Sequence, residues 1–284
     1  MSWLRLEAEG RGQRYSRGRG VCESLMRAGY RGDWPGRLWG RVPGACSVRV
    51  ERFAVPMAVT RTWRVGFASD LHFGPTTPVG VLERARAALA AEPLDLLVLG
   101  GDFVFLDASP RRLSALRAWV EGVPARHKVA VLGNHDLWTW HERIEAALGA
   151  AGVEVLVNRH LRLDELVVAG VDEPWTGQPD GEAAFAGVDP AEPVLAVAHS
   201  PDGFPHVAGR GADLLVCGHT HGGQVALPGG RAIVMPSVEG HRFPHGRHVA
   251  EGLEVFVSRG LGGVEVPVRT FAPPDVAVID LVVG

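Results

Sequence analysis

The sequence predicts an α/β fold in which a second sheet packs on the first. Two observations lead to this prediction: short apolar runs suit buried strands, and helical patterns alternate with the first of these runs. Strand–helix alternation is typical of βαβ units. The later half of the chain is richer in strands and turns, so a second sheet is expected there.

The strands are expected at runs of four to eight residues that are rich in Val and Leu. These runs are 64–69, 94–99, 129–132, 153–157, 166–169, 194–198, 214–217, 254–258 and 276–281. Thr77–Pro78 and Ser109–Pro110 each look like an N-cap followed by the first residue of a helix. A third helix is expected around Ile144 and Leu148.

The composition is that of a globular protein with a substantial core. The chain has 284 residues, of which 46% are hydrophobic, and its formal net charge is −3. No apolar run approaches the roughly 18 residues that a membrane-spanning helix needs, and the first residues lack the pattern of a secretory signal. The three scattered cysteines indicate no disulfide framework. We therefore expect a cytoplasmic protein.

Residues 1–46 differ from the rest of the chain. They carry nine arginines against four acidic residues, a balance of +5 that leaves −8 on the remainder. Their Arg/Gly-rich stretch has no period of 2 or 3.6 residues, so we expect a flexible extension before a domain at 47–284. The alternative is an arm that contacts RNA or a membrane surface, which Trp3, Trp34 and Trp39 would suit. A basic tail on an acidic body is not typical of a dedicated nucleic-acid-binding protein.

Five of the predicted strands are followed by Asp, Asn or His. The side chains are Asp70, His72, Asp102, Asn134, His135, Asp136, His199, His219 and His221. Asp or Asn after a strand usually starts a turn, and a lone His is more often structural, but neither explains five strand ends of one chemical type. The carboxyl ends of strands form the ligand crevice in open α/β sheets. This mixture of oxygen and nitrogen donors suits first-row divalent metals. The number of donor side chains is sufficient to bind two ions.

The order D-x-H, G-G-D, G-N-H-D, H and G-H-T-H closely resembles the calcineurin-like metallophosphoesterase superfamily. The stretches GFASDLHFG, LGGDFV, HSPD, CGHTHGGQ and SRGLGG are most similar to its bacterial YaeI/YkuE-type phosphodiesterase branch. The resemblance covers about residues 48–281 and leaves the N-terminal extension outside. It implies a four-layer α/β/β/α sandwich of two mixed sheets flanked by helices.

The resemblance also implies how the site would work. Asp70, His72, Asp102 and His221 would bind one divalent metal, and Asp102, Asn134, His199 and His219 a second, with Asp102 bridging. His135 would contact the phosphate and assist the leaving group, and Asp136 would orient the His135 imidazole. The metals would be manganese, iron or zinc, and a hydroxide bridging them would attack phosphorus in line.

The function implied is metal-dependent hydrolysis of phosphate esters, with diesters favoured over monoesters. The substrate would be a small-molecule or lipid-linked phosphate ester, and peripheral membrane contact through the extension stays open. The alternative is a non-catalytic scaffold or interaction protein with the same fold, although every expected ligand is present. The sequence contains no GxxxxGK[ST] loop, which argues against a kinase or an NTP-driven motor.

Some residues outside this set have both a functional and a structural interpretation. Arg259 and Arg269 are candidate phosphate clamps. Trp138 either walls a substrate pocket or is buried under the following helix, and the loop 172–175 is either part of the rim or a simple turn. The cluster His241, His245 and His248 is interpreted as loop histidines that border the site rather than as a further metal site. Cys217 is expected in the core.

Overall fold

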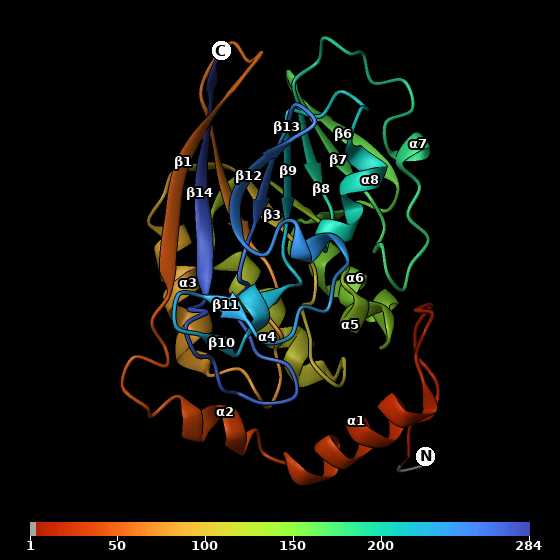
Figure 1. Ribbon diagram of the computed structural model, residues 1–284, viewed down its shortest axis with the longest axis vertical. Helices are drawn as coiled ribbons and strands as arrows, with labels where there is room; N and C mark the ends of the chain where they lie inside the picture. The colour runs from red at the N-terminus through yellow and green to blue at the C-terminus, as the bar shows by residue number, and fades with distance from the viewer. Residues whose placement is uncertain (1–3) are drawn as a thin grey trace.

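Two six-stranded sheets pack face to face in the computed structural model, which describes residues 4–284 (Figure 1). The first sheet contains, in spatial order, β1 (Arg49–Met57), β14 (Asp275–Val283), β2 (Trp63–Ala68), β3 (Leu94–Leu99), β4 (Ala125–Ala130) and β5 (Glu154–Val155). Strand β14 is antiparallel to β2, and the other neighbours in this sheet are parallel.

The second sheet has parallel strands at its centre and an antiparallel pair at each edge. Its spatial order is β12 (Gly246–Ala250), β13 (Leu253–Val257), β9 (Leu214–Cys217), β8 (Val194–Val197), β7 (Leu166–Gly170) and β6 (Arg159–Leu163). A separate two-stranded ribbon joins β10 (Ala226–Leu227) to β11 (Arg231–Ala232).

Helices cover the outer faces of both sheets. The first sheet carries α3 (Val79–Ala90), α4 (Pro110–Glu121) and α6 (His141–Gly149), whose apolar residues share one core with the outward side of β3. The second sheet carries the short helices α7 (Gly181–Ala184) and α8 (Phe204–Val207). The protein is therefore a four-layer sandwich of two mixed sheets flanked by helices, and the expected fold class is confirmed.

The alternation of side chains along each strand explains the layers. In β3, Leu96 and Val98 face the core between the sheets, whereas Leu97 and Leu99 face the helices. Successive residues of a strand point to opposite faces, so a strand that is apolar at every position is buried on both sides. Such strands are the ones that the sequence predicts most directly.

Five strands and five helices that the structure describes in residues 4–284 are missing from the sequence-based prediction. Strands β1, β6 and β12 each form one edge of a sheet, and each mixes polar and apolar residues because one side meets solvent. Strand β4 also begins and ends earlier than the expected 129–132, because its first residues are polar or charged.

The N-terminal segment is helical where the sequence predicts irregular chain. It forms α1 (Arg17–Gly29) and α2 (Trp34–Trp39), which lie across the lower end of the sandwich in Figure 1. Trp34 is half exposed, and Trp3 lies outside the described residues. Among residues 4–284, no helix combines the length and the apolar character needed to cross a membrane.

Candidate metal centre

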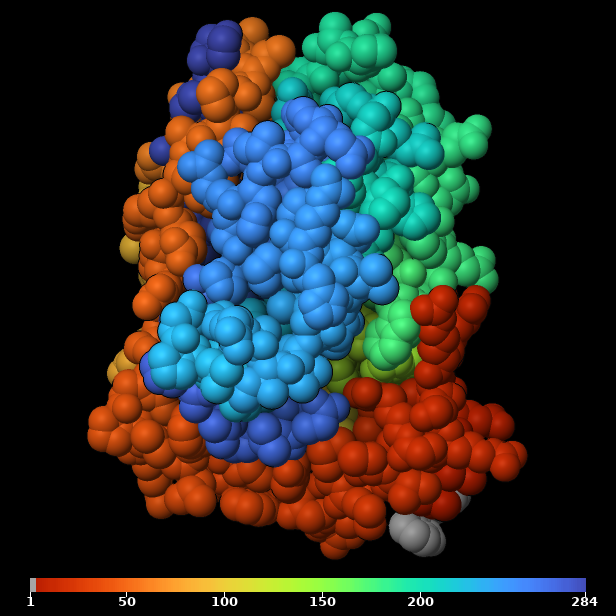
Figure 2. All heavy atoms as spheres, in the orientation of Figure 1, coloured from red at the N-terminus to blue at the C-terminus, as the bar shows by residue number. Residues whose placement is uncertain are grey.

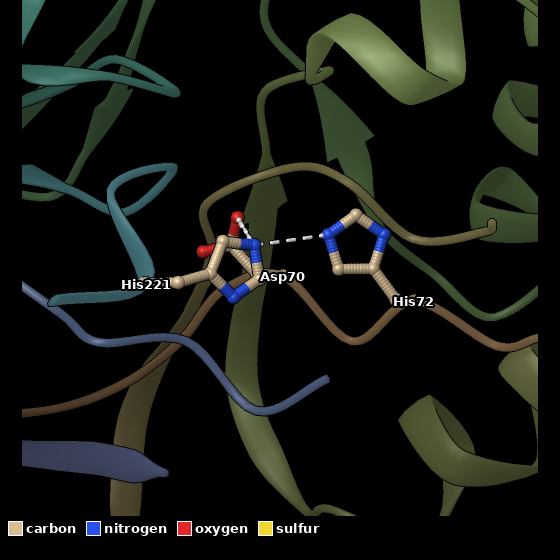
Figure 3. A group of neighbouring side chains, drawn as sticks. All are labelled: Asp70, His72 and His221. Atoms are coloured by element: carbon tan, nitrogen blue, oxygen red, sulfur yellow. Dashed lines mark hydrogen bonds and ion pairs between the residues drawn. The ribbon is translucent and has the colours of Figure 1, made fainter. Parts of the chain in front are cut away.

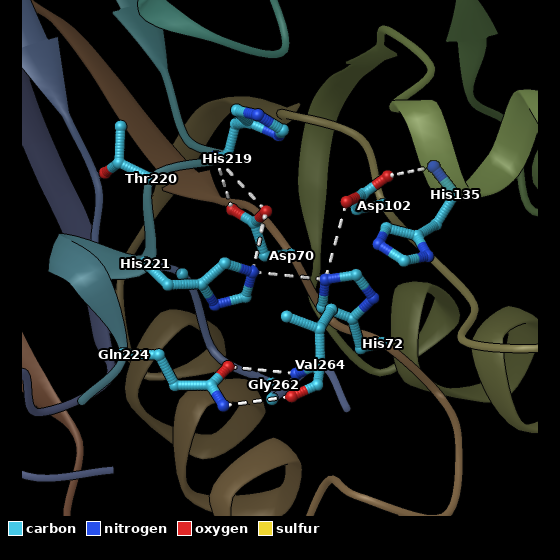
Figure 4. A network of polar contacts seen from close by, with 12 residues as sticks. Asp70, His72, Asp102, His135, His219, Thr220, His221, Gln224, Gly262 and Val264 are labelled. Carbon is cyan, nitrogen blue, oxygen red and sulfur yellow. Dashed lines mark hydrogen bonds and ion pairs between the residues drawn. The ribbon is translucent and has the colours of Figure 1, made fainter. Parts of the chain in front are cut away.

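The predicted polar side chains meet at the end of the sandwich where the parallel strands finish (Figure 4). Asp70 and His72 follow β2, and Asp102 follows β3. Asn134 begins the short helix α5 (Asn134–Leu137) after β4. From the second sheet, His199 follows β8, while His219 and His221 follow β9. All seven side chains are buried.

Five of these residues adopt a backbone conformation that is rare for residues other than glycine. They are Asp70 (φ 55°), His72 (φ 42°), Asp102 (φ 55°), His219 (φ 69°) and His221 (φ 51°). A left-handed conformation costs of the order of 1–3 kcal/mol when the surroundings hold it in place, and such residues cluster at functional sites. The concentration of this conformation at one point indicates a functional site rather than a series of ordinary turns.

Asp70, His72 and His221 form one group of converging ligand atoms, all within 4.8 Å of one another (Figure 3). The Nε2 atoms of His72 and His221 are 3.3 Å apart, and His221 Nε2 is 3.5 Å from Asp70 Oδ1. The backbone N–H of His219 donates to both Asp70 oxygens at 3.1 Å, which fixes the carboxylate.

Asp102, His199 and His219 form a second group with the same 4.8 Å limit. His219 Nδ1 is 3.1 Å from His199 Nε2, and Asn134 Oδ1 is 3.2 Å from the same His199 atom. Asp102 Oδ2 lies between the two groups, 3.3 Å from His199 Nε2 and 3.4 Å from His72 Nε2. The two histidines of the GHTH motif therefore belong to different groups.

This donor set fits divalent metal ions. Each group brings a carboxylate oxygen and two imidazole nitrogens together in a buried space, and these are ordinary ligands of zinc, iron and manganese. His199 Nδ1 donates to the carbonyl of Gly100 at 2.7 Å, which leaves Nε2 as the ring nitrogen that faces Asp102. A backbone carbonyl partner of this kind commonly orients a ligating histidine.

The charges of the centre are set by burial and by neighbouring groups. Burial, with the neighbouring charge of Arg269, lowers the pKa of His221 well below its ordinary value. Burial also opposes ionisation of Asp102, but the charge and hydrogen bond of His199 outweigh it and lower the pKa of Asp102. The arrangement favours a neutral imidazole at His221 and an ionised Asp102, which are the forms that bind metals.

His135 stands beside the two groups and not inside either one (Figure 4). Its backbone N–H donates to Asp102 Oδ1 at 2.8 Å, which fixes the residue relative to the centre. The imidazole lies edge-on to the ring of His72, with 5.0 Å between the centroids, and packs between Phe105 and Trp138. It is thus positioned to meet a ligand at the centre from the side.

Within residues 4–284, the expected hydrogen bond between the Asp136 carboxylate and the His135 imidazole is not among the contacts of Asp136. Its carboxylate instead accepts hydrogen bonds from the backbone N–H groups of Phe103 at 2.8 Å, Gly133 at 3.0 Å and Val104 at 3.3 Å. Burial, followed by the charge of Asp102, raises the pKa of Asp136 to about 8. Asp136 therefore ties the loop after β3 to the loop after β4.

The candidate phosphate clamps have other partners. Arg259 Nη1 donates to Asp275 at 2.9 Å and to Glu51 at 3.3 Å, so two carboxylates engage its guanidinium, and its contact with a substrate stays a prediction. Arg269 Nη2 lies 2.7 Å from His221 Nδ1 and also donates to the carbonyl of Arg259. Arg269 therefore holds the far side of a ligand ring.

Trp138 is buried rather than part of a pocket wall. Its ring packs against Trp175 with 5.4 Å between centroids, and its Nε1 donates to the carbonyl of Gln13 at 2.9 Å. Of the loop histidines, His248 Nε2 pairs with the carbonyl of His245, and His245 Nδ1 is 3.2 Å from Arg259. These contacts agree with the structural interpretation of both candidates, and Cys217 is buried in the core as expected.

A cavity of about 410 Å³ opens directly onto the centre. Asp102, Asn134, His135, His219 and His221 line its polar side. Its other walls are mainly apolar and come from Trp175, Val225, Ile233, Val234, Pro236, Val264 and Val266, with Arg19 and Glu265 at one side.

Arg19 and Gln224 also line this cavity, and neither was identified from the sequence. Arg19 comes from the N-terminal segment, in which no motif marks it. Gln224 ends the CGHTHGGQ stretch, and its side chain exchanges hydrogen bonds with the backbone of Val264 at 2.9 and 3.0 Å (Figure 4). Its place in that stretch is the signal that could have identified it.

The fold and this site define a metal-dependent phosphoric ester hydrolase, and the chain belongs to the calcineurin-like phosphoesterase family, whose profile matches residues 64–223. Among its relatives is "Phosphodiesterase YaeI" of Escherichia coli, which is 32% identical over 237 residues, or 78% of this chain and 82% of YaeI. The metallophosphoesterase YkuE of Bacillus subtilis is 25% identical and covers 75% of this chain and 77% of its own length. "UDP-2,3-diacylglucosamine pyrophosphatase LpxG" of Chlamydia muridarum is 24% identical, over 76% of this chain and 82% of LpxG.

Proposed function

We propose that the protein is a phosphodiesterase that uses two divalent metal ions. The observation that carries this proposal is the pair of ligand groups on either side of Asp102, with His135 beside them. Asp70, His72 and His221 would hold one ion, and Asn134, His199 and His219 the other, with Asp102 shared. When bound, two such ions supply an activated water and stabilise the charge on the attacking and leaving oxygens.

The charge of the centre favours an anionic substrate. Two divalent ions outweigh the two carboxylates of Asp70 and Asp102, and the remaining ligands are neutral. The excess positive charge lies in a buried space, where electrostatic attraction to a phosphate ester is stronger than in water.

His135 would assist the departing oxygen. Burial keeps the pKa of His135 well below its ordinary value, although Asp102 opposes this effect. The imidazole is thus neutral at pH 7 and offers one N–H donor toward a ligand at the centre. A hydrogen bond from this N–H to the leaving oxygen would stabilise the charge that develops there, and the loss of one such donor typically costs about 10²–10³-fold in rate.

The cavity supports a diester rather than a monoester. A diester has an esterified group on each side of phosphorus, and the apolar wall around Val234 and Val266 provides space for the second group beyond the metal centre. The similarity to YaeI, whose name is that of a phosphodiesterase, points in the same direction. The diacylglucosamine substrate in the name of LpxG suggests that this second group is a lipid.

A hydrolysis screen tests the proposal. The full chain is loaded with Mn²⁺, Fe²⁺ or Zn²⁺ in turn and assayed on bis(p-nitrophenyl) phosphate and p-nitrophenyl phosphate. We expect faster hydrolysis of the diester, a loss of at least about 10²-fold in His135→Ala with metal content retained, and loss of both activity and metal in Asp102→Asn.

His241→Ala serves as the matched control, because His241 is exposed and lies outside the ligand groups. Its rate should equal that of the wild type. If the wild type and both site variants hydrolyse these esters at the same background rate with every metal, the chain is a non-catalytic scaffold and the proposal fails.

A further inference from the structure

Arg19 extends from α1 into the cavity beside the metal centre. Its Nη2 atom is 3.5 Å from both Nδ1 and Nε2 of His135, the histidine proposed to assist the leaving group. Residue 19 lies outside the part of the chain that matches the phosphoesterase family profile. A cation from the N-terminal segment is thus placed beside the candidate metal centre.

The guanidinium is held in a fixed position by two neighbours. Its Nε donates to Glu23 Oε1 at 2.9 Å, one turn along the same helix, and its Cζ atom lies 4.1 Å from the centroid of the Trp138 ring. Glu23 is itself buried and is fixed by Tyr15 at 2.9 Å and by Arg5 at 3.2 Å. The position of Arg19 is therefore determined by packing and does not depend on a bound ligand.

The segment that carries Arg19 is attached to the loop that follows His135. Gly12 N–H donates to the carbonyl of Leu137 at 2.9 Å, and Glu9 N–H donates to that of Trp138 at 3.0 Å. Arg11 forms a bidentate ion pair with Asp172, in which Nη1 donates to Oδ2 at 2.6 Å and Nη2 donates to Oδ1 at 2.7 Å. In Figure 2 the segment (red) runs along the lower edge of the molecule, next to the loops of the blue-coloured C-terminal part.

The contacts of the outer end of the guanidinium are weak. Nη2 is 3.6 Å from the exposed carboxylate of Glu265, and the 3.5 Å distances to His135 are at the limit of a hydrogen bond. Within residues 4–284 the structure gives Nη1 of Arg19 no hydrogen-bond partner. Arg19 is thus a cation in a fixed position at the edge of the cavity, with N–H groups that have no strong partner. Such a group can donate hydrogen bonds to an anionic ligand in the cavity.

We propose that Arg19 binds a phosphate oxygen of the substrate, so that the N-terminal segment completes the active site. This inference rests on the proposed phosphodiesterase function. Arginine suits this role because its planar group presents two parallel N–H donors to a phosphate, whereas lysine offers a single point charge. The competing interpretation is that Arg19 only holds α1 against Trp138 and Glu23.

The test compares Arg19→Gln and Arg19→Lys with the wild type. Each metal-loaded protein is assayed for KM and kcat on bis(p-nitrophenyl) phosphate and for the inhibition constant of inorganic phosphate. Metal content and thermal unfolding are measured in parallel. The matched control is Arg17→Gln, which removes an exposed arginine from the first turn of the same helix.

The proposal predicts that Arg19→Gln raises both KM and the phosphate inhibition constant by about tenfold to hundredfold, the range for one lost charge-assisted hydrogen bond. Metal content and kcat should change by less than about threefold, Arg19→Lys should be intermediate, and Arg17→Gln should match the wild type. Unchanged KM and phosphate inhibition in an active, folded Arg19→Gln variant would overturn the inference while leaving the phosphodiesterase proposal intact. A wild type inactive on every ester tested would instead reject the phosphodiesterase proposal itself.

Discussion

Asp102 shows how strongly single residues of this site depend on one another. One of its oxygens lies between His72 and His199, and the other accepts the backbone N–H of His135. Its own backbone is left-handed, and a Cβ on Gly133 would come closer than 3.0 Å to its carboxylate. Gly133 of the GNHD stretch and Gly218 of the GHTH stretch are therefore needed, because the carboxylates of Asp102 and Asp70 occupy the space that a methyl group would take.

Gly218→Ala tests this dependence at the residue that precedes the GHTH histidines. Its added Cβ would approach Asp70 Oδ2 and Ser69 Oγ more closely than 3.0 Å, so Asp70 must move. We expect metal affinity to fall by about 10–100-fold, the usual effect of disturbing the immediate support of a ligand. Metal titration monitored by calorimetry measures this change.

Gly149→Ala is the matched control, since Gly149 ends α6 and a Cβ there has no atom within 4 Å. Its metal affinity should equal that of the wild type. Equal affinities in both variants would show that the space beside Asp70 is not required.

At the scale of elements, parallel strands explain why distant residues meet. Strands β2, β3 and β4 are parallel neighbours in one sheet, and β8 and β9 are parallel neighbours in the other. Their carboxyl ends therefore lie at the same end of the sandwich. Helix α1 lies across this end, where Gly20 packs against the backbone of Arg5.

Gly20→Ala should displace α1 without altering Arg19 itself. A Cβ at this position would overlap the carbonyl of Arg5. If Arg19 binds the substrate, KM for bis(p-nitrophenyl) phosphate should rise about tenfold, in the direction of Arg19→Gln, and limited proteolysis of the N-terminal segment should accelerate.

Gly29→Ala provides the control at the other end of α1, because a Cβ there meets nothing within 4 Å. It should leave both KM and proteolysis unchanged. A Gly20→Ala protein with faster proteolysis but unchanged KM would mean that the position of α1 is irrelevant to the substrate.

At the scale of the whole molecule, the candidate centre joins the two sheets. Asp70, Asp102 and Asn134 come from the first sheet, whereas His199, His219 and His221 come from the second. Apolar side chains form the core between the two sheets, and the side chains of the candidate centre add direct polar contacts from one sheet to the other. Metal binding should therefore stabilise the assembly of the two sheets.

Chelation is expected to lower the thermal stability of the whole protein. Binding at a hundredfold excess over Kd stabilises the folded state by about 2.7 kcal/mol, which corresponds to roughly 5–10 °C in Tm for a domain of this size. Differential scanning calorimetry with and without EDTA measures the shift. Asp102→Asn should show a much smaller one, and a wild-type Tm that is insensitive to both metal and chelator would contradict the expectation.

The sequence alone determined the buried strands and the chemical type of the site. Fully apolar runs leave little alternative to a buried strand, and Asp, Asn and His after five of them define the donor set wherever the strands lie. The edge strands β1, β6 and β12 could not be identified in this way, because their composition depends on which side faces solvent.

Only the tertiary structure decided which partner each side chain has. Asp136 bonds to backbone N–H groups, Arg259 to Asp275 and Arg19 to Glu23, with its outer end toward His135. A carboxylate or guanidinium is compatible with many partners, so its role follows from distances across the fold and not from the neighbouring letters. The N-terminal segment is the clearest case, since Arg11 and Arg19 contact residues that lie more than a hundred positions away in the chain.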